Sequence, residues 1–367
     1  MKPVLFVTGH APDYRVGAFA RLHELENIEV ALFGGRYKHG GGAGERELPF
    51  PSRRVRPREL VALPAQSRYR AVVCPTAGRL APAASWLGAR RARVPLILWA
   101  SLWAHPRSVA HAFTYLPLRH LYRSADAVVT YGPHVSAYVR ERGARNVYEA
   151  PQSVDNDFWS ASPLAPPSEP AWPRTAAVKF VFVGRPAREK GLEVLMAAWH
   201  ASGLQAPAAA LVLVGVGSSL RAIGGGGAAA QPMEGVVCLD AVAPVELRSL
   251  YADSDVLVLP SIPTRTFLEP WGLVVNEAMN RGLAVITTDA VGAAAGGLVR
   301  DGHNGLVVPA GDSRALAEAI RRLAGDSALR QRLGAAGASD VRAFSHDAWA
   351  KGFSRALATV GLSRARW

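Results

Sequence analysis

The feature that most constrains the fold is an alternation of short apolar runs with helical patterns. Each half of the chain contains one such alternating series. In the first half, the apolar runs are typical of buried strands and cover residues 3–8, 28–33, 71–74, 95–99, 127–131 and 146–150. A second series covers residues 179–183, 210–214, 236–239, 256–259, 283–287 and 306–308. Strands that alternate with helices predict a parallel sheet with helices on both faces, so each half is predicted to be a doubly wound α/β unit.

The composition changes between the two series. Residues 151–174 are rich in Pro, Ser and Trp, which predicts a linker. We therefore expect a Rossmann-like N-terminal domain over residues 1–165 and a second one over residues 166–344. Residues 34–58 are rich in Gly, Arg and Lys without periodicity and are predicted to form a long loop.

The overall composition excludes several classes of protein. The chain has 367 residues, 49% of them hydrophobic, but its longest apolar run, residues 94–104, is too short to cross a bilayer. The N-terminus has the pattern of a core strand without a cleavage site, so we expect a cytoplasmic protein. The two cysteines lack metal-ligand spacing, and the sequence contains no HExxH, GxxxxGK or GxSxG motif. We therefore expect no bound metal.

The positive charge is concentrated in the first half. Residues 1–160 hold 22 Lys and Arg against 12 Asp and Glu, whereas the remaining residues hold 20 against 17. This imbalance suits an acidic acceptor or the anionic inner face of a membrane, and Trp86, Trp99 and Trp103 in the same half suit a lipid-linked glycan. A solvated basic surface is an equal alternative. Nucleic acid is not expected, because the basic residues form no recognisable reading motif.

The stretch at residues 260–282 combines two acidic residues with the start of a helix. Glu269 precedes Pro270, so it is expected to be extended, with the helix beginning at Pro270 and ending at Gly282. The amides near Gly272 and Leu273 are then unpaired donors at the positive end of the helix, where a phosphate can bind. Acidic residues on both sides of a bound diphosphate can accept hydrogen bonds from sugar hydroxyls.

Other candidate residues follow predicted strands, where parallel sheets bind their ligands. Arg185 and Lys190 lie after residues 179–183 and can clamp a diphosphate. Gly217 ends a short glycine loop after another strand, and His105 follows residues 95–99 at the same edge of the first sheet. Ordinary loop cations and a structural histidine are the alternatives to these roles.

These motifs together resemble the retaining glycosyltransferases of family 4, which have the GT-B fold. The resemblance is carried by VGRPAREKG at residues 183–191, LVLVGVG at 211–217, DVLVLPS at 255–261 and EPWGLVVNEAMNRGLAVITTD at 269–289. It implies two Rossmann-like domains that face a central cleft, with the donor nucleotide in the second and a final helix, residues 345–367, returning to the first.

The resemblance also implies roles for individual residues. Arg185 and Lys190 match positions that hold the donor diphosphate, Glu277 the position that binds ribose, and Glu269 the one that contacts the transferred sugar. Gly272 and Leu273 match amides beside the phosphate and sugar. Among the other expected site residues, His105 is catalytic, Val274 and Gly217 bind the donor, and Arg15 and Gly17 lie on the acceptor side.

We therefore expect a metal-independent, retaining hexosyltransferase without a cofactor, which moves a sugar from a UDP- or GDP-linked donor to an acceptor hydroxyl. The acceptor is a glycan, a lipid-linked saccharide or a small metabolite. Two alternatives stay open: a nucleotide-sugar epimerase of the GT-B fold, and a non-catalytic nucleotide-sugar-binding protein. Incubation with the donor alone distinguishes an epimerase, because only an epimerase makes a new sugar without an acceptor.

Overall fold

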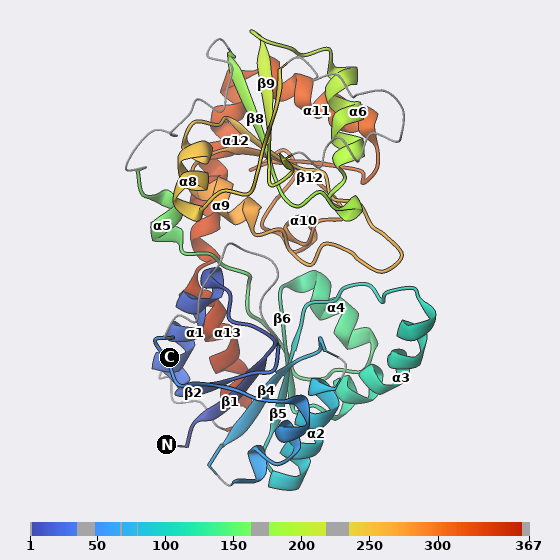
Figure 1. Cartoon of the computed structure of the whole chain (residues 1–367), viewed down its shortest axis with the longest axis vertical. Coiled ribbons are helices and arrows are strands. Elements are labelled where there is room, and N and C mark those ends of the chain that lie inside the picture. The colour runs from blue at the N-terminus through green and yellow to red at the C-terminus, as the bar shows by residue number, and fades with distance from the viewer. Residues whose placement is uncertain are drawn as a thin grey trace. The chain divides into compact units, whose positions relative to one another are not determined.

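The chain forms two α/β units (Figure 1). The computed structural model describes residues 2–34, 48–66, 68–78, 80–162, 176–217 and 235–361. The first unit comprises Met1–Asp155 with Phe344–Trp367, and the second comprises Asn156–Ala343.

The first boundary lies before the predicted one at residue 165. Helix α5 (Asn156–Ser160) explains the difference, because it packs against α9 (Val274–Asn280) of the second unit. Its short NDFWS sequence lies inside the stretch predicted as a linker. Residues 163–175 of that stretch lie outside the described residues.

The first unit is built on a parallel sheet of seven strands in the order β3-β2-β1-β4-β5-β6-β7. The strands are β1 (Val4–Thr8), β2 (Ile28–Leu32), β3 (Ser52–Arg54), β4 (Ala71–Pro75), β5 (Leu96–Ala100), β6 (Ala127–Thr130) and β7 (Val147–Glu149). The helices are α1 (Asp13–Glu26), α2 (Ala81–Ala92), α3 (Val109–Ser124), α4 (Pro133–Glu141) and α13 (His346–Thr359), with short 3-10 turns η1 (Pro57–Val61) and η2 (Pro64–Gln66). The strand order reverses between β1 and β4, as in dinucleotide-binding sheets.

Apolar side chains on both faces of this sheet explain why helices cover both. On one face, Phe6 of β1 packs against Phe19 of α1 and against Trp349 and Phe353 of α13. Helices α1 and α13 lie side by side there, although they come from opposite ends of the chain (Figure 1). On the other face, Leu5 belongs to a second buried cluster with residues of α2, α3 and α4.

The prediction of a long loop over residues 34–58 was wrong in its second part. Residues 35–47 lie outside the described residues, but β3 and the start of η1 fall within the remainder. Strand β3 is a three-residue edge strand with the sequence SRR, which pairs with β2. A polar edge strand this short has no apolar alternation, so the sequence pattern does not reveal it.

The second unit repeats the same topology with six parallel strands in the order β10-β9-β8-β11-β12-β13. The strands are β8 (Val178–Val183), β9 (Ala209–Val214), β10 (Val236–Leu239), β11 (Val256–Leu259), β12 (Ala284–Thr288) and β13 (Leu306–Val308). Besides α5 and α9, the helical elements are η3 (Arg188–Lys190), α6 (Leu192–Ser202), α8 (Pro244–Ala252), α10 (Gly292–Ala295), α11 (Ser313–Gly325), α12 (Ser327–Asp340) and η5 (Val341–Ala343). Here the order reverses between β8 and β11. The prediction of two doubly wound α/β units is therefore confirmed.

Candidate functional site

Two loops of the second unit meet at the point where its strand order reverses. One follows β8 and contains η3, and the other follows β11 and leads to α9. The amide of Ile262 in the second loop donates to the carbonyl of Glu189 in the first at 3.0 Å. Parallel sheets of this type bind ligands at the carboxyl ends of the strands on either side of the reversal. The structure therefore brings the two loops that carry the predicted donor-side residues into contact at the strand reversal.

Lys190 and Glu269, two of the predicted catalytic residues, form an ion pair at this point. The Lys190 Nζ lies 2.5 Å from the Glu269 Oε2, although 79 residues separate them in sequence. Glu269 is buried, and the Ser261 hydroxyl donates to the same carboxylate oxygen at 3.4 Å. A lysine ammonium has three donors, so Lys190 can keep this contact while it binds an additional anion.

Gly191 allows the loop that carries Lys190 to lie against the end of β11. Its φ of +69° is left-handed, and a Cβ at this position would lie 1.9 Å from the Pro260 carbonyl oxygen. Gly203 at the end of α6 has nearly the same φ of +70°, but a Cβ there would meet nothing within 4 Å. The two glycines therefore separate the effect of backbone strain from that of close approach.

We predict that Gly191→Ala is more destabilising than Gly203→Ala. Both variants place alanine in the left-handed region, which costs on the order of 1 kcal/mol, but only the first also forces two loops apart. We expect a difference of about 2 kcal/mol or more in the free energy of unfolding, measured with urea. Equal effects of the two substitutions would show that the loops of Gly191 and Pro260 can move apart without loss of stability. That result would contradict their close contact.

Arg185 lies in the same loop as Lys190 but is not held as firmly. Its guanidinium lies 3.4 Å from the Glu189 carboxylate, and 54% of the Arg185 side chain is exposed. Exposed ion pairs of this kind contribute little to stability. Arg185 can therefore leave Glu189 for a stronger anion at low cost.

The helix after Glu269 begins later than predicted. Helix α9 starts at Val274, not at Pro270, because Gly272 has a left-handed φ of +93° that no helix accommodates. The segment before it is extended, and Glu269 forms an isolated parallel bridge with Val291. Within the described part of the chain, the amides of Gly272 and Leu273 have no acceptor. The start of α9 thus keeps the free donors that the sequence predicted, on a helix of seven residues.

Glu277 lies on α9 and contacts Tyr251, a residue that the sequence analysis did not identify. The Tyr251 hydroxyl of α8 donates to the Glu277 Oε2 at 3.0 Å. Burial raises the pKa of the Glu277 carboxyl from its ordinary 4.5 to about 7, and the Tyr251 hydrogen bond opposes that rise. A carboxyl with this pKa changes its charge near neutral pH, which is more common at functional sites than elsewhere.

Two further predicted donor-binding residues lie near this region. Val274 is the first residue of α9 and is partly buried. Gly217 follows β9 and lies close to Asp240, whose Oδ1 would be 1.9 Å from a Cβ at that position. Their predicted contacts with a donor stay predictions.

A cavity of about 410 Å³ opens at the corresponding reversal in the first unit. Its lining includes the ends of β1, β4 and β5, together with Arg15, Trp99 and Tyr131. Arg15 is only 5% exposed, its Nη2 donates to the Gln152 Oε1 at 2.6 Å, and its guanidinium lies 5.1 Å from the centre of the Trp99 ring. Among the described residues, the Arg15 Nη1 has no hydrogen-bond partner. The cavity therefore combines a buried cation with aromatic walls.

Gly17 and His105, the other predicted residues of the first unit, do not line this cavity. A Cβ at Gly17 would lie 2.5 Å from the His346 ring, so this glycine allows α1 and α13 to pack closely. His105 uses both ring nitrogens locally: Nε2 donates to the His111 carbonyl at 2.9 Å, and Nδ1 accepts from the Tyr138 hydroxyl at 3.4 Å. The roles predicted for Gly17 and His105 in acceptor binding and catalysis stay predictions.

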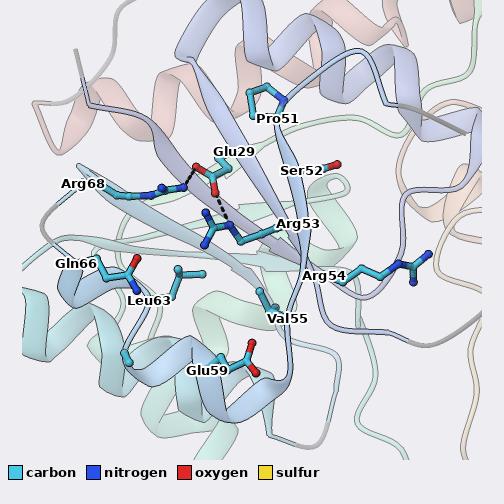
Figure 2. Close-up of a pocket in the computed structure, with 11 residues that line it drawn as sticks. Glu29, Pro51, Ser52, Arg53, Arg54, Val55, Glu59, Leu63, Gln66 and Arg68 are labelled. Atoms are coloured by element: carbon cyan, nitrogen blue, oxygen red, sulfur yellow. Dashed lines mark hydrogen bonds and ion pairs between the residues drawn. The ribbon is translucent and has the colours of Figure 1, made fainter. Parts of the chain in front are cut away.

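A second cavity of the first unit, about 620 Å³, contains none of the predicted site residues. Figure 2 shows the Glu29 carboxylate on β2 between the guanidinium groups of Arg53 and Arg68. The Arg53 Nε lies 2.7 Å from Glu29 Oε1, and Arg68 contacts the other carboxylate oxygen. One carboxylate therefore pairs with both arginines in this cavity.

Comparison with known proteins connects the geometry of the second unit with a family. Residues 177–326, which include β8 through α11, match the family "Glycosyl transferases group 1". This region, 150 of the 367 residues, is therefore similar to the glycosyl transferases group 1 family. It contains Arg185, Lys190, Glu269 and Glu277, so each predicted donor-side residue named here lies inside the matched region.

Relatives with similar sequences carry glycosyltransferase names. A phosphatidyl-myo-inositol mannosyltransferase of Mycobacterium leprae is 32% identical over 218 residues, which cover 59% of this chain and 54% of the relative. A D-inositol 3-phosphate glycosyltransferase of Streptomyces bingchenggensis is 37% identical over 105 residues, which cover 28% of this chain and 21% of the relative. The matched segments thus span about half of the first relative and about a fifth of the second.

Solved structures of glycosyltransferases with the GT-B fold share the architecture of the chain. Anabaena Alr3699/HepE, in complex with UDP and glucose, matches with a TM-score of 0.73 at 17% identity, over 98% of this chain and 100% of that one. Sucrose-phosphate synthase of Thermosynechococcus elongatus matches with a TM-score of 0.71 at 21% identity, over 98% and 99%. At these identities the comparison establishes the fold, and the predicted GT-B fold class is confirmed.

The matched region contains two polar contacts that sequence reasoning missed, Tyr251 with Glu277 and Ser261 with Glu269. Ser261 ends the DVLVLPS motif, so its place after a buried strand was a usable signal. Tyr251 had no such signal, because it lies in an ordinary helical pattern. In the first unit, Gln152 was missed because it lies within the predicted linker.

Proposed function

We propose that the protein is a retaining glycosyltransferase that moves a hexose-type sugar from a UDP- or GDP-linked donor to an acceptor hydroxyl. The single observation that carries this proposal is the Lys190–Glu269 pair at the strand reversal of the region that matches the glycosyl transferases group 1 family. A cation beside unpaired amides suits a diphosphate, and an adjacent buried carboxylate suits sugar hydroxyls.

The proposed roles follow the positions of the side chains. Arg185 and Lys190 stabilise the negative charge that grows on the diphosphate as the bond to the sugar breaks, together with the amides of Gly272 and Leu273. Glu269 accepts hydrogen bonds from hydroxyls of the transferred sugar. Charge stabilisation by preorganised donors is usually the largest contribution to catalysis of this kind.

The proposed step keeps the configuration at the anomeric carbon. The bond between this carbon and the diphosphate oxygen breaks, and the bond to the acceptor oxygen forms on the same face of the sugar. The acceptor proton passes to the departing phosphate, so neither a metal nor a cofactor takes part in the proposed step. His105 stays a candidate on the acceptor side.

The acceptor is proposed to bind in the Arg15 cavity of the first unit. Its aromatic walls suit a sugar or cyclitol ring, and the unpartnered Arg15 Nη1 suits an anionic or hydroxyl group of the acceptor. Glycans, lipid-linked saccharides and small metabolites all have such groups. The inositol named for both relatives is one acceptor of this kind. A cytoplasmic location of the reaction is part of the proposal.

A donor screen tests the proposed function. We expect one UDP- or GDP-linked sugar to raise the melting temperature more than the others do. With an acceptor present, we expect NMR of the product to show the anomeric configuration of the donor. Conversion of the donor alone into a different nucleotide sugar would establish the epimerase instead. Binding without turnover toward any acceptor or water would favour the non-catalytic alternative.

Glu277→Ala tests the proposed ribose contact. A carboxylate that accepts from both ribose hydroxyls contributes on the order of 1–3 kcal/mol, so we expect nucleoside diphosphate binding to weaken by about tenfold or more. Isothermal titration calorimetry at pH 8 measures the change. Wild-type affinity in the variant would remove Glu277 from the donor site.

A further inference from the structure

Helix α3 exposes a stripe of large apolar side chains. Val109 and Phe113 are each 78% exposed and Leu116 is 68% exposed. Their spacing of four and three residues places them on one face of the helix. The opposite face is anchored, since Leu121 and Tyr122 belong to the buried cluster on the sheet. Exposed apolar groups gathered in this way typically mark an interaction surface.

The surroundings of this stripe are strongly basic. Between Glu59 and Asp126 the sequence contains nine arginines, no lysine and no acidic residue, and two of these arginines, Arg68 and Arg70, form ion pairs with Glu29 and Glu26. Arg107 precedes α3 and Arg123 ends it, and both are exposed. This stretch accounts for much of the positive charge of the first half of the chain.

Helix α2 adds to the same basic surface. The Trp86 ring of α2 lies 5.4 Å from the His120 ring of α3, and the Arg90 guanidinium lies 5.4 Å from the centre of the Trp86 ring. Arg91 follows Arg90 at the exposed end of α2. The contact through Trp86 thus connects further exposed arginines with α3.

We propose that α3 lies in the surface of an anionic lipid bilayer. Val109, Phe113 and Leu116 would enter the boundary between headgroups and acyl chains, and the arginines of α2 and α3 would contact anionic headgroups. A helix with an apolar face and a cationic surround binds membranes in this way, and each nearby arginine strengthens binding. Among the described residues, no helix is long and apolar enough to span a bilayer.

A second copy of the chain fits this surface less well. In a twofold dimer the same patch meets itself, so the arginines of one copy would face those of the other. Residues 60–125 offer no carboxylate to pair with them. An anionic lipid surface can contact both the apolar stripe and the arginines. The membrane proposal does not depend on the proposed sugar transfer.

Sedimentation with vesicles tests the apolar contact. We expect the full chain to bind vesicles of phosphatidylcholine with 30% phosphatidylglycerol and to bind pure phosphatidylcholine far more weakly. Phe113→Ser with Leu116→Ser should weaken binding by about tenfold or more. The matched control is Val245→Ser on α8, where the side chain is 50% exposed, and it should leave binding unchanged.

The charge contribution has its own pair of variants. Arg107→Gln and Arg123→Gln should each weaken binding by about fivefold at low salt, whereas Arg314→Gln, at an exposed position on α11, should not. Circular dichroism and the melting temperature verify that every variant is folded. Absence of wild-type binding to anionic vesicles would overturn the proposal. A concentration-dependent dimer that the Phe113 and Leu116 substitutions abolish would instead assign the surface to a second copy.

Discussion

Lys190→Ala is expected to lower kcat by about 10²-fold or more. The Lys190 ammonium lies 2.5 Å from Glu269, at the strand reversal where the diphosphate is proposed to bind. Charge develops on the diphosphate as the sugar bond breaks, so loss of a preorganised cation removes stabilisation from the transition state more than from the bound donor. We therefore expect a larger effect on kcat than on KM, measured with the donor selected by the thermal-shift screen.

Controls separate this effect from a loss of folding. Removing Lys190 leaves the buried Glu269 carboxylate without its ion-pair partner, which destabilises the loop as well. Melting temperature and donor affinity of the variant measure that contribution. Arg188 is exposed on the same 3-10 turn, so Arg188→Ala should change kcat by less than about twofold.

Arg185→Ala is expected to act in the same direction as Lys190→Ala, with a loss of about 10²-fold or more in kcat. Because the Arg185 contact with Glu189 is exposed, loss of Arg185 should leave the melting temperature nearly unchanged. Unchanged turnover in either the Lys190 or the Arg185 variant would exclude that side chain from the proposed catalytic site.

The sequence could predict the two sheets because a continuous apolar run directly indicates a buried strand. Buried strands such as Val4–Thr8 and Val256–Leu259 have their apolar residues in an unbroken series. The elements that were missed are short or polar. Edge strand β3 reads SRR, and α5 is a five-residue helix within a Pro- and Ser-rich stretch.

The site could be predicted only in part, because contacts between distant residues depend on topology. Motif spacing placed Lys190 and Glu269 in two loops, but only the order of β8 and β11 in the sheet brings these loops together. Likewise, Pro270 is a good first residue for a helix, yet the left-handed Gly272 delays the start of α9. The raised pKa of Glu277 depends on burial by neighbours that are not visible in its own segment.

Glu277→Gln is expected to make the protein more stable than the wild type at pH 8. Burial raises the pKa of Glu277 to about 7 in the folded protein, whereas the unfolded chain has the ordinary value of 4.5. Between these values the folded wild type retains a proton that the unfolded chain has released, so the free energy of unfolding falls as the pH rises. Glutamine mimics the protonated form and has no such dependence.

The expected size of the effect follows from the shift. A shift from 4.5 to about 7 corresponds to on the order of 3 kcal/mol of wild-type stability, fully present below pH 4.5 and lost as the pH rises through 7. We therefore expect urea unfolding to give similar stabilities for the two proteins near pH 4.5. At pH 8 the variant should be more stable by on the order of 3 kcal/mol.

The same substitution should have the opposite effect on the complex with a nucleotide. The ionised carboxylate is proposed to accept from the ribose hydroxyls, so UDP or GDP at pH 8 should stabilise the wild type more than the variant. Glu193→Gln on the exposed face of α6 removes one negative charge without this burial and serves as the matched control. A stability difference for Glu277→Gln that does not change between pH 4.5 and 8 would show that burial does not hold a proton on Glu277. An equal response of both proteins to the nucleotide would separate that carboxyl from donor binding.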